Sequence, residues 1–153
     1  MSCTVTTPSV ADFTAWLLSS VAVPQSVISV QGPLINDSFC QAKAQVNYLL
    51  CVSPVFYRLA LYNLATDIMM NYGVDQAGET PADYFACMQR LYNLNAFSGG
   101  VVASAGDSGT SASVTVPTSL SDLTLSDLQN LKTPWGRAYL AIAQKTGTNW
   151  GLT

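Results

Sequence analysis

The sequence contains no histidine and few charged residues of either sign. Histidine is the usual general base and the usual partner of a nucleophilic serine or cysteine, so its absence from all 153 residues excludes the common catalytic triads. Charged residues make up 10% of the chain, against about 25% in an average soluble domain. A subunit enclosed by neighbours needs fewer surface charges than a free monomer. The composition therefore favours a subunit of an assembly, although a monomer with an uncharged polar surface would look the same.

Motifs for catalysis and cofactor binding are also missing. No serine pattern of the relevant type accompanies Lys43 or Lys145. Asp122 and Asp127 each follow a serine at an expected helix start, where capping is the usual role. The glycines of residues 99–109 match neither the dinucleotide-binding nor the phosphate-binding pattern. We therefore expect no enzymatic activity, no cofactor and no metal.

Basic patches and long apolar runs are absent as well. The six Lys and Arg residues are scattered along a chain of net charge −3, which predicts no direct binding to nucleic acid. No apolar run approaches the length of about 18 residues that a transmembrane helix needs. The first residues carry no Lys or Arg of a signal peptide, so we expect neither export by that route nor a membrane location.

The four cysteines form no C-x-x-C pair, which argues against a zinc site or a thioredoxin-like motif. Cys40, Cys51 and Cys87 lie among apolar residues at helical spacing. We expect these three thiols to be buried, reduced and unpaired, and Cys3 to be accessible.

Apolar residues at helical spacing predict a single, mainly helical domain over residues 1–153, with its body at 9–145. The expected bundle has about five helices, and the stretch at 54–72 is apolar enough to be its central helix. A further short helix is expected where Ser126 and Gln129 have capping-box spacing. The expected starts of the main helices are Ser9, Asn36 or Asp37, Pro54, Pro81 and Pro134, and the expected ends are near 22, 50, 73, 98 and 146.

Residues 27–30, which precede Gly32 and Pro33, are predicted to be a short extended or turn segment. Farther along the chain, residues 99–117 are rich in Val, Ser, Thr and Gly and alternate at period two beside a glycine-containing turn. They predict a β-hairpin or a long loop that projects from the helices. The residues taken to mark this hairpin are Val102, Gly106, Asp107, Gly109 and Val114.

Residues 146–153 have no helical spacing but contain Trp150 and Leu152. Two apolar side chains beside flexible glycines are typical of a segment that docks against a surface. We predict an extended C-terminal arm that binds a neighbouring protein; the alternative is an arm that folds back onto its own domain.

The run from Thr133 to Leu140 resembles the C-terminal signature of tailed-phage head-completion proteins, also called head-to-tail adaptors or connectors. In that signature, a Thr-x-aromatic-Gly-x-x-Tyr run opens the last helix. The order of features is similar too, with a Tyr/Leu/Ala-rich segment at 57–70 and a Gly/Ser-rich stretch at 100–116 before the motif. The resemblance covers about residues 36–145. The chain differs by having Trp135 at the aromatic position, and Asp67 where a histidine often follows the Leu-Ala pair.

The resemblance implies a helical adaptor that forms a ring of about twelve copies beneath the portal protein and joins it to the next component of the neck. DNA would pass through the channel of this ring without sequence-specific binding. The protein would be made in the cytoplasm of the bacterial host and would reside in the virion neck, at the head–tail junction. The residues that we assign to a portal or subunit interface are Trp135, Arg137, Tyr139, Trp150 and Leu152.

A second function class remains open from the sequence. The chain would also suit a small cytosolic helical module that binds a protein or a ligand and has no place in a virion. Such a module would be a monomer or dimer with a ligand-sized pocket, whereas an adaptor contacts copies of itself.

Overall fold

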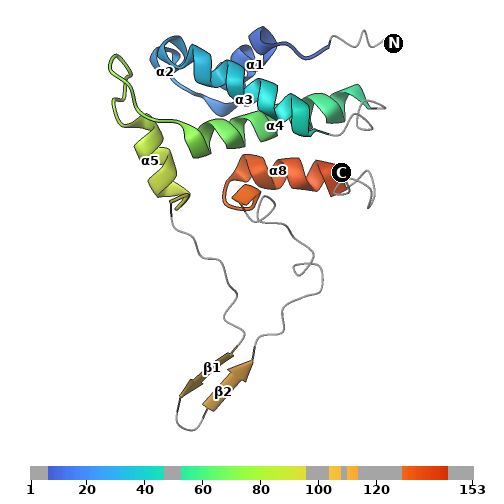
Figure 1. The fold of residues 1–153 in the computed structure, drawn as a ribbon, viewed down its shortest axis with the longest axis vertical. Helices are drawn as coiled ribbons and strands as arrows, with labels where there is room; N and C mark the ends of the chain where they lie inside the picture. The colour runs from blue at the N-terminus through green and yellow to red at the C-terminus, as the bar shows by residue number, and fades with distance from the viewer. Residues whose placement is uncertain (1–6, 47–52, 96–103, 108–109, 114–128, 145–153) are drawn as a thin grey trace.

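The computed structural model describes residues 7–46, 53–95, 104–107, 110–113 and 129–144. The described residues are mainly helical, which confirms the predicted fold class (Figure 1). The helices are α1 (Val10–Trp16), the π-helical segment η1 (Leu17–Val21), α2 (Gln25–Val30), α3 (Gly32–Gln45), α4 (Pro54–Tyr72), α5 (Tyr84–Leu91) and α8 (Pro134–Ala143). No helix within these ranges is long and apolar enough to cross a bilayer.

Helix α4 is the centre of the bundle, as its composition predicts. Figure 1 shows α4 between α3 and α8, and these two helices make its most extensive contacts. Every residue from Ala60 to Met70 is buried, so this stretch is covered on all sides. Pro54 lies in the first turn, and Gly73 is the C-cap, as predicted. A Cβ atom on Gly73 would lie 2.1 Å from the Phe85 ring, so glycine lets α5 approach the end of α4.

The N-terminal helical segment follows the prediction for residues 9–22. The Asp12 backbone N–H donates to Ser9 Oγ at 3.2 Å, and Ser9 Oγ donates to the Asp12 carboxylate at 2.7 Å. This reciprocal pair caps α1. The segment ends at Ala22, whose φ of 58° is left-handed and stops the helix.

Two boundaries near residue 30 differ from the prediction. Residues 27–30 are the last four residues of α2 and are not extended, and Val27 and Ile28 are buried. The next helix begins at Gly32, not at Asn36 or Asp37, because proline is tolerated within a first helical turn. Short apolar runs and Gly-Pro pairs occur in both helix starts and turns, so local sequence did not distinguish these alternatives.

The fourth predicted helix is shorter than expected. It was predicted over about 81–98, whereas α5 spans Tyr84–Leu91. The Asp75 carboxylate accepts hydrogen bonds from the backbone N–H groups of Phe85, at 2.6 Å, and Ala86, at 3.0 Å. A carboxylate about ten positions earlier in the chain therefore caps α5, which local sequence does not reveal.

Two short strands lie within the predicted 99–117 segment. Strand β1 (Ser104–Asp107) pairs antiparallel with β2 (Thr110–Ser113), with Ser104 opposite Ser113 and Asp107 opposite Thr110. Gly106 and Asp107, two of the residues predicted to mark the hairpin, belong to β1. The other residues of this segment, including Val102, Gly109 and Val114, lie outside the described residues, so the extent of the hairpin stays a prediction.

The cysteine prediction was wrong for the two described cysteines. Cys40 and Cys87 are free but exposed, whereas we predicted burial. Cys40 follows the buried Phe39 on α3, and one residue along a helix turns the side chain by about 100° away from the core. Cys3 and Cys51 lie outside the described residues.

We expect both exposed thiols to react rapidly with a thiol reagent in the folded protein. Absorbance-monitored labelling should show that Cys40→Ser and Cys87→Ser each remove one equivalent of fast reaction. The unmodified chain should show at least two fast equivalents. A rapid phase that neither substitution reduces would contradict the exposure of these side chains.

Candidate functional site

The motif that carries the family resemblance forms the start of α8 and its contact with α4. Thr133 is fully buried and is the N-cap of α8. Its hydroxyl accepts a hydrogen bond from the Gly136 N–H at 2.9 Å and donates one to the Asp67 carboxylate on α4. A single hydroxyl therefore caps one helix and joins it to the central one.

The partner carboxylate, Asp67, is 1% exposed. It also accepts a hydrogen bond from Asn71 Nδ2 at 3.1 Å. Burial raises the pKa of the Asp67 carboxyl from 3.8 to about 6, against the opposing effect of the hydrogen bonds from Thr133 and Asn71. These contacts satisfy both carboxylate oxygens, so the geometry assigns Asp67 a role in joining two helices.

The glycine and tyrosine of the motif also have steric explanations. A Cβ atom on Gly136 would lie 2.0 Å from the carbonyl oxygen of Asn130, so no other residue fits without a backbone shift. Tyr139 is 8% exposed and belongs to the hydrophobic core. The packing around the start of α8 therefore explains threonine at position 133, glycine at position 136 and a large apolar residue at position 139.

The structure places the predicted interface residues in different environments. Trp135 is partly buried, and its ring packs edge-on against Tyr92 with centroids 5.6 Å apart. Arg137 is exposed and donates to the Leu131 carbonyl at 3.0 Å. Tyr139 lies in the core, which leaves Trp135 and Arg137 as the described members with accessible surface. Trp150 and Leu152 lie outside the described residues.

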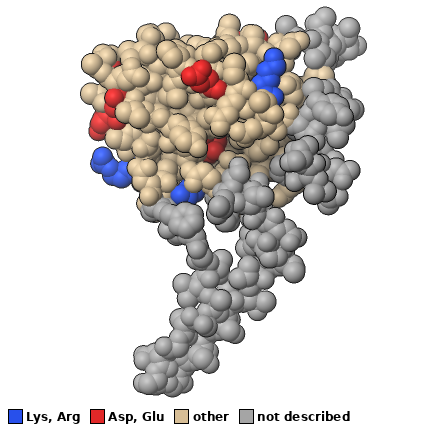
Figure 2. Space-filling view, in the orientation of Figure 1, with Lys and Arg blue, Asp and Glu red and all other residues tan. Residues whose placement is uncertain are grey.

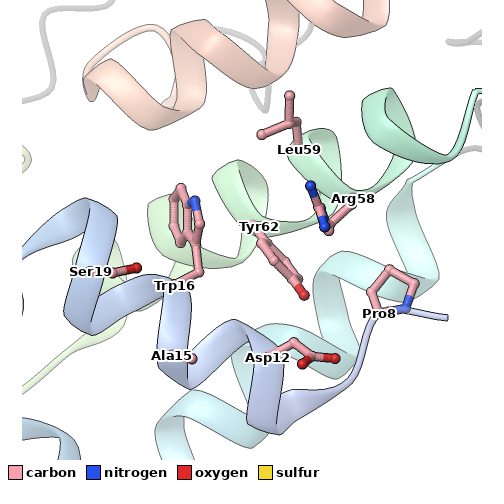
Figure 3. Close-up of a pocket in the computed structure, with 8 residues that line it drawn as sticks. All are labelled: Pro8, Asp12, Ala15, Trp16, Ser19, Arg58, Leu59 and Tyr62. Carbon is pink, nitrogen blue, oxygen red and sulfur yellow. The ribbon is translucent and has the colours of Figure 1, made fainter. Parts of the chain in front are cut away.

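A groove that sequence reasoning missed lies between α1 and α4 (Figure 3). Its volume is about 430 Å³. The segment from Pro8 through α1 to Ser19 of η1 forms one wall, and the N-terminal half of α4 forms the other. The lining residues are Pro8, Asp12, Ala15, Trp16, Ser19, Arg58, Leu59 and Tyr62.

The Tyr62 hydroxyl is the most unusual group in this groove. Tyr62 is 3% exposed, and its hydroxyl is buried without a hydrogen-bond partner. Burial raises the pKa of this hydroxyl; the Asp12 carboxylate adds to the increase, and the Arg58 guanidinium opposes it. A buried hydroxyl without a hydrogen-bond partner costs about 1–3 kcal/mol. A bound molecule that forms a hydrogen bond with Tyr62 would remove this cost.

A second hollow, of about 360 Å³, lies over Asp67. Amide side chains dominate its wall, and Gln129 Nε2 donates to Asn71 Oδ1. This bond extends the contact between Asp67 and Thr133, so the hollow belongs to the junction of α4 with the segment before α8. Its lining residues are Gln41, Gln45, Leu64, Asp67, Ile68, Asn71, Tyr72, Gln129 and Asn130.

The described surface is poor in charge and carries several apolar side chains. Figure 2 shows one face on which few acidic and basic side chains are scattered among uncharged ones. Among the described residues, no three His, Cys, Asp or Glu side chains gather closely enough to hold a metal ion. The most exposed large apolar residues are Val74 at 71%, Tyr72 at 68%, Leu91 at 67% and Val55 at 53%.

We expect Gly136→Ala to lower the free energy of unfolding by about 3 kcal/mol, because its Cβ would displace the Asn130 carbonyl. Gly32→Ala is the matched control, since a Cβ there meets nothing within 4 Å. The control should change stability by no more than about 1 kcal/mol. Urea unfolding of both variants tests this, and equal effects would contradict the close contact.

Asp67 should make stability depend on pH. Because the folded-state pKa is raised, the folded chain binds this proton more tightly than the unfolded chain does. The resulting stabilisation is present below pH 3.8 and is lost as the pH rises to about 6. The full change is about 3 kcal/mol at 1.36 kcal/mol per pKa unit.

Urea unfolding between pH 3.5 and about 7 measures this dependence. Asp67→Asn should remove the loss of stability over that range, whereas Asp37→Asn, at an exposed position of α3, should retain it. An Asp67→Asn profile parallel to that of the unmodified protein would show that the Asp67 carboxyl does not titrate in this way.

Comparisons with protein-family models, with curated proteins and with solved structures found no match to this chain.

Proposed function

We propose that this chain is a structural subunit of a tailed-phage virion, a head-to-tail adaptor (connector). Copies of it form a ring beneath the portal protein and link the capsid to the next component of the neck. It has no catalytic role in this proposal. DNA passes through the channel of the ring without sequence-specific contacts.

The observation that supports the proposal most directly is the packing of the Thr-x-aromatic-Gly-x-x-Tyr motif. Thr133 caps α8 and binds Asp67, Gly136 lies against backbone, and Tyr139 packs into the core. Each position thus has a stereochemical reason within this helical packing. Because packing explains each position of the motif, a chain that shares the motif is expected to share this packing. The motif therefore supports a likeness to the adaptors in fold as well as in sequence.

The surface supports a role in an assembly. Only 10% of the residues are charged, and several described apolar side chains are more than half exposed. Contacts with neighbouring subunits would remove such side chains from water, which is favourable by about 25 cal/mol for each Å² of apolar surface buried.

The charge distribution suits a channel through which DNA moves. The six basic residues are spread along a chain of net charge −3. Each phosphate that a Lys or Arg neutralises adds affinity, and strong affinity would retain the DNA in the ring. A slightly acidic ring makes few such contacts, which favours passage.

The proposal assigns two further contacts to neighbouring proteins. Trp135 and Arg137 have accessible surface at the start of α8, where they would face the portal or an adjacent subunit. The arm at 146–153, with Trp150 and Leu152 as anchors, would dock on the same neighbours. The 99–117 hairpin would project from the helices and contact a neighbour in the ring.

One observation favours the alternative of a small binding module. The groove between α1 and α4 has a volume within the range of about 300–1,000 Å³ that is usual for ligand sites, and it contains an unpartnered hydroxyl. A binding module would remain a monomer or dimer at all concentrations, whereas the adaptor proposal requires contacts between many copies.

Electron microscopy and native mass spectrometry of the concentrated full chain, alone and with a portal protein from the same genome, test the proposal. The expected particles are closed rings of about twelve copies. Isolated monomers or dimers in both samples would contradict the adaptor proposal and favour the binding module. The position of the gene between those for a capsid protein and tail proteins would agree with the ring result.

A further inference from the structure

We propose that the groove between α1 and α4 receives Tyr72 from a neighbouring copy of this chain. This inference rests on the proposed ring and names the contact that would join adjacent subunits. The groove lies at the N-terminal end of α4, and Tyr72 is the last residue of that helix.

The polar groups of the groove require an uncharged occupant that can both donate and accept hydrogen bonds. Figure 3 shows the Tyr62 hydroxyl between the side chains of Arg58 and Asp12. The hydroxyl has no partner, and the described contacts place no hydrogen bond or ion pair on the exposed Arg58. One positive and one negative charge balance each other, so neither a phosphate nor a cationic side chain fits as well as a neutral hydroxyl.

The rest of the groove suits an aromatic ring. The Trp16 ring forms part of the wall, and its centroid lies 5.7 Å from that of Tyr62 and 6.2 Å from that of Phe13. Leu59 and Ala15 add apolar surface. Another ring that entered here would extend an existing aromatic cluster, and such ring pairs stabilise contacts beyond the area that they bury.

Tyr72 has the chemistry that this groove requires. Among the described large apolar residues, Val74, Tyr72 and Leu91 are the most exposed, at 71%, 68% and 67%. Val74 and Leu91 have no polar atom to satisfy the Tyr62 hydroxyl. The Tyr72 phenol combines an aromatic ring with a hydroxyl that accepts from Arg58 or Tyr62 and donates to Asp12.

The Tyr72 side chain that fills a groove must come from another copy of the chain. Tyr72 follows Arg58 by fourteen residues on the continuous helix α4, which at 1.5 Å per residue separates them by about 21 Å along the axis. A copy therefore cannot fill its own groove with its own Tyr72. If each copy offers its groove to one neighbour and Tyr72 to the other, the contact is head-to-tail, the type that closes rings.

The Tyr62 hydroxyl is buried, so under this proposal an incoming phenol reaches it only if Arg58, which lines the same groove, moves aside. Arg58 is exposed and has a long, flexible side chain. Its displacement by an incoming phenol would uncover the Tyr62 hydroxyl and give both groups a hydrogen-bond partner. The free subunit keeps this hydroxyl unsatisfied, and docking of a neighbour removes that cost.

Cross-linking between two separately labelled batches of the full chain tests the contact. Both batches carry all four cysteines replaced by serine; one adds Ser19→Cys at the groove, and the other adds Val74→Cys beside Tyr72. A short bis-maleimide should join the two batches. Tyr72→Phe in the second batch should lower the yield about fivefold, the ratio for one ordinary hydrogen bond, and Tyr72→Ala should lower it further.

Leu91→Cys replaces Val74→Cys in the matched control, because Leu91 is almost equally exposed. Cross-linking between the Leu91→Cys and Ser19→Cys batches should reach only the low yield that random collisions produce. Tyr62→Phe in the first batch should also lower the yield about fivefold without lowering the melting temperature, since it removes an unsatisfied group. Equal yields for Val74→Cys and Leu91→Cys, or a yield unaffected by Tyr72→Ala, would overturn the proposal.

Sedimentation of the Tyr72→Phe and Tyr72→Ala variants with native cysteines gives the same test without labelling. The constant for self-association should fall about fivefold for Tyr72→Phe and more for Tyr72→Ala. Rings that persist unchanged in Tyr72→Ala would refute this contact but leave the adaptor function intact. Failure of the unmodified chain to form rings, alone or with the portal protein, would instead refute the function and this contact together.

Discussion

The described fold depends on the hydrogen bond that Thr133 donates to the buried Asp67 carboxylate. It joins the N-terminus of α8 to the middle of α4, across 66 positions of sequence, while the same hydroxyl caps α8. Removal of either partner would leave a buried polar group unsatisfied. Close to this bond, Gly136 lies against the Asn130 backbone, where a Cβ atom would not fit. The raised pKa of Asp67 is the electrostatic cost of burying this carboxylate.

Helix α4 runs from the buried contact with Thr133 to accessible residues near each of its ends. Its middle is buried, with its most extensive contacts to α3 and α8, and its exposed side chains lie near its two ends. At one end, Arg58 and Tyr62 line the groove with α1; at the other, Tyr72 is exposed. A rigid helix fixes the distance between these ends. A subunit that contacts its neighbours through both would therefore repeat with a constant spacing, as a ring requires.

The adaptor proposal and the groove proposal rest on different observations. The first depends on the motif from Thr133 to Tyr139 and on a surface with few charges, whereas the second depends on an unpartnered hydroxyl beside two opposite charges. Both describe a protein that works through contacts and not through catalysis. The absence of histidine is consistent with both, because an adaptor needs neither a general base nor a metal ligand.

The sequence by itself determined the helical fold class, the central position of α4 and the starts of α1 and α8. These features depend on the spacing of apolar residues and on hydrogen bonds within one helical turn, which local sequence encodes. Tertiary structure alone decided the start of α5 and the groove around Tyr62. Both features depend on contacts with segments distant in the sequence. The spacing of apolar residues indicates which face of a helix is buried but does not identify the segment that packs against it.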